Sequence, residues 1–102
     1  MTLAEFLLAR IAEDEAEAAY VPVEHQDEPG LSWWGEYGHL SIAPSRVLAE
    51  CAAKRRIVEQ YRDNTLLLDS VDLGYQNGLE WVVATLALAH ADHPDYDERW
   101  RP

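Results

Sequence analysis

Cysteine and long apolar runs are scarce in this 102-residue chain, which has one cysteine, Cys51, and no stretch of eighteen apolar residues. A single cysteine excludes an intrachain disulfide, and the missing apolar stretch excludes a transmembrane helix. Residues 1–10 also lack the basic start and the small-residue cleavage site of a signal peptide. We therefore expect a cytoplasmic protein that does not attach to membranes.

Basic residues are few as well: eight Lys and Arg stand against 19 Asp and Glu, which gives a net charge of −11. Five of the eight lie in residues 45–62, which carry +3, whereas residues 1–44 carry −8 and residues 63–102 carry −6. Direct binding of nucleic acid needs a positive docking surface, so we predict none. The acidic segments either neutralise the basic one and solvate the surface, or form an acidic face for a basic partner.

Glycine-rich phosphate loops, the serine nucleophile elbow and the paired-histidine zinc motif are all missing. Cys51, the one candidate nucleophile, lies at helical spacing from Val47 and Val58, which favours a small inert core residue over a reactive thiol. Small acidic helical domains without such motifs are more often binders than catalysts. We therefore expect a protein without catalysis of its own.

The sequence does contain helical periodicity, in a composition that is 48% hydrophobic, as in globular proteins. We predict one domain, residues 1–102, that is mostly α: three main helices form a small bundle, with a long aromatic connector and a C-terminal tail packed on the body. The first helix, about residues 3–19, begins at a capping box formed by Thr2 and Glu5. Its predicted apolar stripe comprises Leu3, Leu7, Ile11 and Ala18, with Ala4 and Leu8 beside it.

The second helix, about residues 44–62, begins at Pro44, a residue suited to the first helical position. Residues 64–75 are ambiguous, because their leucines would either finish this helix or form a short strand. The third helix follows at about residues 78–91, with Asn77 as its N-cap. The predicted apolar stripe of the second helix comprises Val47, Cys51, Val58 and Tyr61.

The third helix is apolar on two sides. A domain of this size does not bury both sides against itself, so we predict a homodimer. The side expected to carry a partner-binding surface includes Trp81 and Leu88. The other side, expected to face the core, comprises Leu79, Val82, Val83 and Leu86.

The connector, residues 20–43, contains an aromatic trio, Trp33, Trp34 and Tyr37. Connectors of this length are uncommon unless they cover something or have a function. The trio therefore either covers the core as a hydrophobic lid or belongs to the partner-binding surface.

The tail, residues 92–102, turns at Pro94 and carries Tyr96 and Trp100. Aromatic side chains of this size are costly to leave in water. We predict that the tail docks on the body through these two residues.

His90 and His93 are the candidate metal ligands, three residues apart at the end of the third helix. A zinc site needs three or four converging ligands, which other residues would have to complete. The candidates for that role are Asp92, Asp95, Cys51, His25 and His39. We interpret His90 as a core histidine and His93 as part of the helix end, and we predict no metal and no cofactor.

Two stretches, residues 46–59 and 91–102, carry a resemblance to known proteins. The first contains Arg-Val-Leu-Ala-Glu and Lys-Arg-Arg-Ile-Val, and the second contains His-Pro-Asp-Tyr and Trp-Arg-Pro. With the Ala- and Glu-rich first helix, they make the chain similar to a family of small proteins of Streptomyces, other actinobacteria and their phages, grouped as a domain of unknown function. The resemblance implies a source and a location, but no activity.

We therefore expect a small acidic cytoplasmic interaction protein of an actinobacterium or its phage. One alternative is an acidic inhibitor or DNA mimic that acts on a basic host protein, which would present an ordered row of carboxylates. Another is a small metal-dependent enzyme with His90 and His93 as ligands. A third is a structural dimer with no further chemistry.

Overall fold

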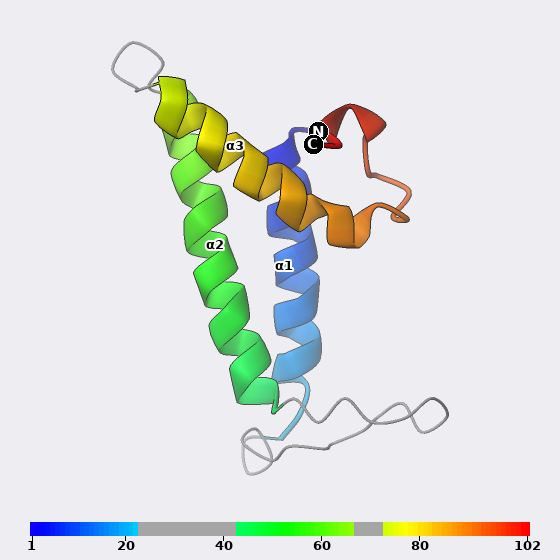
Figure 1. Cartoon of the computed structure of the whole chain (residues 1–102). Coiled ribbons are helices and arrows are strands. Elements are labelled where there is room, and N and C mark those ends of the chain that lie inside the picture. Colours follow the sequence, from blue (N-terminus) through cyan, green and yellow to red (C-terminus); the bar gives the residue numbers. More distant parts are fainter. Residues whose placement is uncertain (23–42, 67–72) are drawn as a thin grey trace. The chain divides into compact units, whose positions relative to one another are not determined.

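The computed structural model describes residues 1–22, 43–66 and 73–102, and these ranges contain three helices packed together and no strand. The helices are α1 (Leu3–Ala19), α2 (Pro44–Leu66) and α3 (Leu73–Ala87) (Figure 1). Two short 3-10 helices follow, η2 (Leu88–His90) and η3 (Glu98–Trp100). The predicted all-α fold is confirmed. Among the described helices, none is long and apolar enough to cross a membrane.

The chain divides into two compact units, and both α1 and α2 contribute to each of them. Unit 1 comprises Met1–Arg10 and Arg55–Pro102, and unit 2 comprises Ile11–Lys54. In unit 1, α3 crosses the start of α1, and the tail then returns so that the two termini lie side by side (Figure 1). That the whole chain forms one domain stays a prediction.

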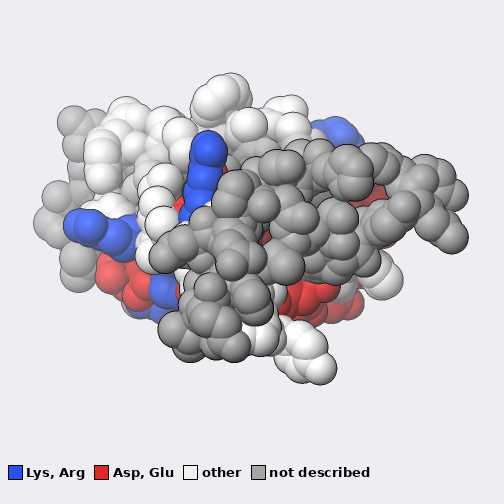
Figure 2. Space-filling view, turned by 90° about the horizontal axis from the view of Figure 1, so that it is seen from below, with Lys and Arg blue, Asp and Glu red and all other residues white. Residues whose placement is uncertain are grey.

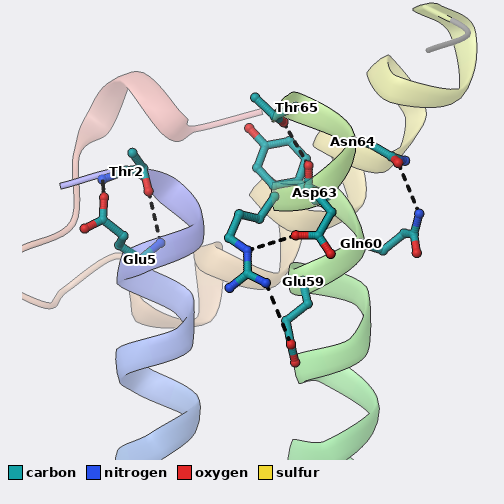
Figure 3. A network of polar contacts seen from close by, with 9 residues as sticks. Thr2, Glu5, Glu59, Gln60, Asp63, Asn64 and Thr65 are labelled. Atoms are coloured by element: carbon teal, nitrogen blue, oxygen red, sulfur yellow. Dashed lines mark hydrogen bonds and ion pairs between the residues drawn. The ribbon is translucent and has the colours of Figure 1, made fainter. Parts of the chain in front are cut away.

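The start of α1 is the predicted capping box. The Thr2 N–H donates to Glu5 Oε1 and the Glu5 N–H donates to Thr2 Oγ1, both at 3.1 Å (Figure 3). These reciprocal bonds satisfy two backbone donors that a helix start otherwise leaves without partners. Hydrogen bonds from the backbone and the hydroxyl of Thr2 also lower the pKa of the Glu5 carboxyl.

The buried face of α1 follows helical spacing. Phe6 is completely buried, and Arg10 one turn later is only 7% exposed. Neither residue was among those expected from the sequence to form the stripe. The expected members Leu3, Leu7, Ile11 and Ala18 are buried, as is Ala4, whereas Leu8 is half-buried.

Helix α2 begins at Pro44, as predicted, and buries Cys51 and Val58. It ends at Leu66 rather than near residue 62, so the strand alternative is wrong for residues 64–66. Hydrogen bonds between residues four positions apart stabilise the last turns of α2. The Gln60 amide donates to Asn64 Oδ1 at 3.1 Å, and the Thr65 hydroxyl donates to the Tyr61 carbonyl at 2.8 Å (Figure 3).

Helix α3 begins at Leu73, five residues earlier than predicted, so Asn77 lies inside the helix and is not its N-cap. The Asn77-Gly78 pair, which favours turns, is accommodated inside the helix. The Gln76 amide donates to Thr65 Oγ1 at 2.8 Å, which ties the first turns of α3 to the end of α2. The helix then tightens into η2 at Leu88, so its α-helical part ends before the predicted residue 91.

The buried side of α3 also differs from the expected stripe. Val83, Ala84 and Ala87 are buried, whereas Val82 is 36% exposed. Two of these three buried residues are alanines with short side chains, and the larger apolar residues of the expected stripe other than Val83 are more exposed. Leu79 and Leu86 are half-buried at the edge of the core.

Candidate functional site

An aromatic cluster surrounds Phe6 in unit 1. The Phe6 ring centroid lies 5.1 Å from that of Trp100 and 6.0 Å from that of Tyr96. The rings of His93 and His90 approach it edge-on at 5.5 and 6.2 Å. Both aromatic residues proposed to dock the tail therefore lie against α1.

Arg10 links α1 to the turn that follows η2. Its guanidinium carbon lies 5.2 Å from the centroid of the Phe6 ring, and its Nη1 donates to His93 Nε2. The Asp95 N–H donates to the other ring nitrogen, His93 Nδ1, at 3.0 Å. A neutral imidazole has one acceptor nitrogen, so only one of the two donors is satisfied at a time. Arg10 and His93 thus join the helix to the tail by polar as well as aromatic contacts.

The candidate metal ligands are engaged in this cluster. His90 and His93 both pack edge-on to Phe6. Within the described residues, no group of three His, Cys, Asp or Glu side chains is placed to hold a metal ion. His25 and His39 lie outside those residues. Cys51 is 3% exposed, a position typical of a packed core thiol.

The last residues of the tail are held by ion pairs. Arg99 makes a two-pronged contact with the Asp97 carboxylate, with its Nη2 at 2.6 Å from Oδ2, and Arg101 does the same with Glu98, with its Nε at 2.8 Å from Oε2. The Arg99 N–H also donates to Asp97 Oδ1, which caps η3. Hydrogen bonds from Arg99 lower the pKa of Asp97, and those from Arg101 lower the pKa of Glu98.

A pocket of about 530 Å³ lies within unit 1, between the start of α1, the second half of α2, α3 and the tail. Its volume is in the range of small-ligand sites. Three aromatic side chains contribute to its wall, Tyr61, Trp81 and Trp100. The other lining residues are Thr2, Leu3, Asn77, Glu80, Ala84, Arg99, Arg101 and Pro102.

The residues predicted for partner binding have different environments. Trp81 is 62% exposed and lines the pocket, whereas Leu88 is half-buried in η2. The aromatic trio Trp33, Trp34 and Tyr37 lies outside the described residues. The structure therefore leaves one of these candidates, Trp81, open to solvent.

A second apolar surface on α3 consists of Tyr75, Leu79, Val82 and Leu86, here called the α3 stripe. Tyr75 is 54% exposed and Val82 36% exposed, and the two leucines are half-buried. Their spacing of four, three and four residues is that of the core positions of a coiled coil over two heptads. The same spacing is present in the sequence. Tyr75 was not recognised as part of it, because the helix was predicted to begin only near residue 78.

Two of the five basic side chains on α2, Arg46 and Arg62, pair with acids of the same helix. Arg46 Nε lies 3.2 Å from Glu50 Oε1, and Arg62 lies 3.1 Å from Asp63 and 3.9 Å from Glu59. On the left of the face drawn in Figure 2, Lys and Arg side chains lie next to Asp and Glu side chains. The ion pairs of Arg46 and Arg62 fit neutralisation of charge within α2.

Sequence reasoning missed Phe6, Arg10 and Glu80. Phe6 is the one phenylalanine of the chain and lies at helical spacing from Leu3, which was a sufficient signal. Arg10 shares that face, but a charged residue is not expected in a core without a partner. Glu80 lies beside Tyr61 in the pocket wall only because α3 packs against α2, which the sequence alone does not show.

A family described as "Family of unknown function (DUF6221)" matches residues 1–102, so the chain belongs to this family. No curated protein matches the chain, and no solved structure matches it either.

Proposed function

We propose that the chain is a small acidic interaction protein, without catalysis of its own, that self-associates as a homodimer through the α3 stripe. The observation that supports this most directly is the exposure of Tyr75 and Val82 on a helix that also leaves Leu79 and Leu86 half-buried. Side chains of these types are typical of interface cores rather than of solvated surfaces.

The spacing of the α3 stripe suits a second copy as the partner. Apolar side chains at these heptad positions insert between those of a facing helix, and a two-fold axis brings the same stripe from each chain together. Each apolar side chain of one copy would then meet an apolar side chain of the other. No complementary charge on a different protein is required.

The net charge of −11 acts against self-association. Like charges repel over roughly 8–10 Å at physiological ionic strength, and added salt shortens this range. A dimer held by the α3 stripe should therefore become tighter as the salt concentration rises. An assembly held by ion pairs would show the reverse dependence.

Sedimentation velocity at several protein and salt concentrations tests the proposal. The wild-type protein should approach twice the 11.6 kDa mass of the chain at tens of micromolar. Val82→Glu should remain at the monomer mass, because it places a charge in the centre of the interface. Ala53→Glu, on the exposed surface of α2, is the matched control and should dimerise as the wild type does. A wild-type monomer, or equal behaviour of the two variants, would refute the proposal.

The cellular location and the source of the protein are also proposals. The resemblance of residues 46–59 and 91–102 supports a cytoplasmic protein of an actinobacterium or its phage. An acidic inhibitor of a basic host protein and a histidine-ligated metal enzyme remain the competing functions. A mass spectrum of the native protein separates the latter, because a bound zinc ion would add its own mass to the dimer and to the monomer.

A further inference from the structure

The pocket in unit 1 combines aromatic walls with the side-chain carboxylate of Glu80. Tyr61, Trp81 and Trp100 line it from α2, α3 and the tail respectively. Aromatic rings present a negative face, which attracts cations as well as apolar groups. Trp81 is 62% exposed, so its ring is accessible to an incoming ligand.

The two arginines at the pocket do not make it an anion site. The Arg99 guanidinium makes three contacts with the Asp97 carboxylate, and the Arg101 guanidinium makes two with the Glu98 carboxylate. Bidentate pairs of this kind fix the guanidinium and compensate its charge. An incoming anion would have to compete with a carboxylate already in place.

Glu80 is the remaining charged residue of the pocket wall, and among the described residues it has no ion-pair or hydrogen-bond partner. Its carboxylate acts on the neighbouring phenol. Burial raises the pKa of the Tyr61 hydroxyl, and the negative charge of Glu80 raises it further. Glu80 therefore places a negative charge close to the Tyr61 ring at this wall.

We propose that this pocket binds an organic cation, a guanidinium or alkylammonium group, which pairs with Glu80 and stacks against Trp81, Tyr61 and Trp100. The same chemistry is offered by a free amine and by an Arg or Lys side chain of a polypeptide. The acidic charge of the whole chain attracts either ligand over longer distances. The site lies within one chain, so it goes beyond self-association and does not require it.

The test uses the full-length protein and two matched probes, N-acetyl-arginine amide and N-acetyl-citrulline amide, which differ mainly in charge. Nuclear magnetic resonance titration follows the tryptophan indole N–H signals, with the Trp81 signal assigned from Trp81→Phe. The arginine probe should shift the Trp81 signal saturably, and the citrulline probe should bind at least about tenfold more weakly. Equal binding of the two probes, or no saturation by about 10 mM, would overturn the proposal.

Two charge variants locate the cation. Glu80→Gln should weaken binding of the arginine probe by about tenfold or more, because it removes the pairing charge at an exposed position. Glu17→Gln, an exposed residue of unit 2, changes the net charge equally and should alter affinity by less than about twofold. Equal losses in the two variants would show that only the overall charge attracts the probe, and would refute the site.

A last comparison identifies the source of the cation. Binding of the peptide Gly-Gly-Arg-Gly-Gly at least about tenfold tighter than agmatine supports the site as a reader of polypeptide side chains. Equal affinities support a site for a free amine. Val82→Glu, which is designed to remain monomeric, should bind the arginine probe as the wild type does, so failure of the dimer and failure of the pocket are distinguishable.

Discussion

The first half of α1 buries Phe6 and Arg10 and starts at a reciprocal cap, whereas the second half carries four acids and no base in its last turn. The cap places Glu5 at the positive end of the helix dipole, where a carboxylate is favourable, but Glu17 lies at the negative end, where it is not. The difference indicates where the stability of α1 originates. Its start is fixed by capping and by the aromatic cluster. In its second half, the buried apolar side chains are those of Ile11 and Ala18.

The largest effect should come from removing the centre of the aromatic cluster. Phe6→Ala leaves a cavity among Trp100, Tyr96 and the two histidines and should lower the free energy of unfolding by about 3–5 kcal/mol. Tyr20→Ala, an aromatic truncation at the other end of α1, should change it by less than about 0.5 kcal/mol, because Tyr20 is 91% exposed. Urea unfolding followed by circular dichroism measures both, and equal losses would break the contrast between the two ends.

Removing the tail should have the next largest effect. Deletion of residues 95–102 takes away Tyr96 and Trp100 and exposes one side of Phe6. The melting temperature should fall by several degrees, since about 1 kcal/mol corresponds to about 4–8 °C in a domain of this size. A melting curve identical to that of the full chain would show that the contacts of the tail with α1 contribute nothing to stability.

Much of this fold could be read from the sequence because its signals are local. The capping box at Thr2, the start at Pro44 and the burial of Leu3, Leu7 and Ile11 on α1 all follow from residues within a few positions of one another, although Phe6 and Arg10 of the same face were missed. The start of α3 could not be found in this way. The first turns of α3 contact α2 through the hydrogen bond from Gln76 to Thr65, eleven residues away, and Asn77 and Gly78 lie inside the helix despite their preference for turns.

The candidate sites were harder to predict for the same reason. Trp81 is recognisable as an aromatic residue on a helix, but its place in a pocket with Tyr61 and Glu80 requires α2 and α3 to be in contact. The compensation of Arg99 and Arg101 by tail carboxylates has a local cause, because each arginine follows its acidic partner by two or three residues. The preference for a cation can be inferred only when the lining of the pocket and the ion pairs of its two arginines are both known.

The cap at the start of α1 should contribute less than the aromatic cluster. Thr2→Ala removes the hydroxyl that accepts from the Glu5 N–H and should cost about 1 kcal/mol. Thr85→Ala is the matched control, because the Thr85 hydroxyl donates to the Trp81 carbonyl within a helix already formed. It should leave stability unchanged or raise it slightly, since alanine is the better helix former. Thermal unfolding of both variants tests this, and a larger loss for Thr85→Ala would contradict it.

Acid should weaken unit 1 through the carboxyls whose pKa values are lowered by folding, Glu5, Asp97 and Glu98. A lowered pKa means that the folded state favours the ionised form, so the stabilisation is present above the unfolded values of 4.5, 3.8 and 4.5. It is lost as the pH falls through the folded values. The melting temperature should therefore drop as the pH falls below these unfolded values, with a shallower drop in Glu5→Gln. An identical pH profile in that variant would remove the cap from the explanation.

The smallest effect should come from correcting the charge at the end of α1. Glu17→Lys replaces an acid by a base in the last turn, where a cation interacts favourably with the helix dipole, and should raise stability by about 0.3–1 kcal/mol at low salt. Glu17→Gln, which only removes the unfavourable charge, should give a smaller part of that gain. Both gains should shrink as salt is added, because the residue is exposed. Melting curves at two salt concentrations measure the effect, and a gain that does not depend on salt would indicate that packing, rather than charge, limits this end of the helix.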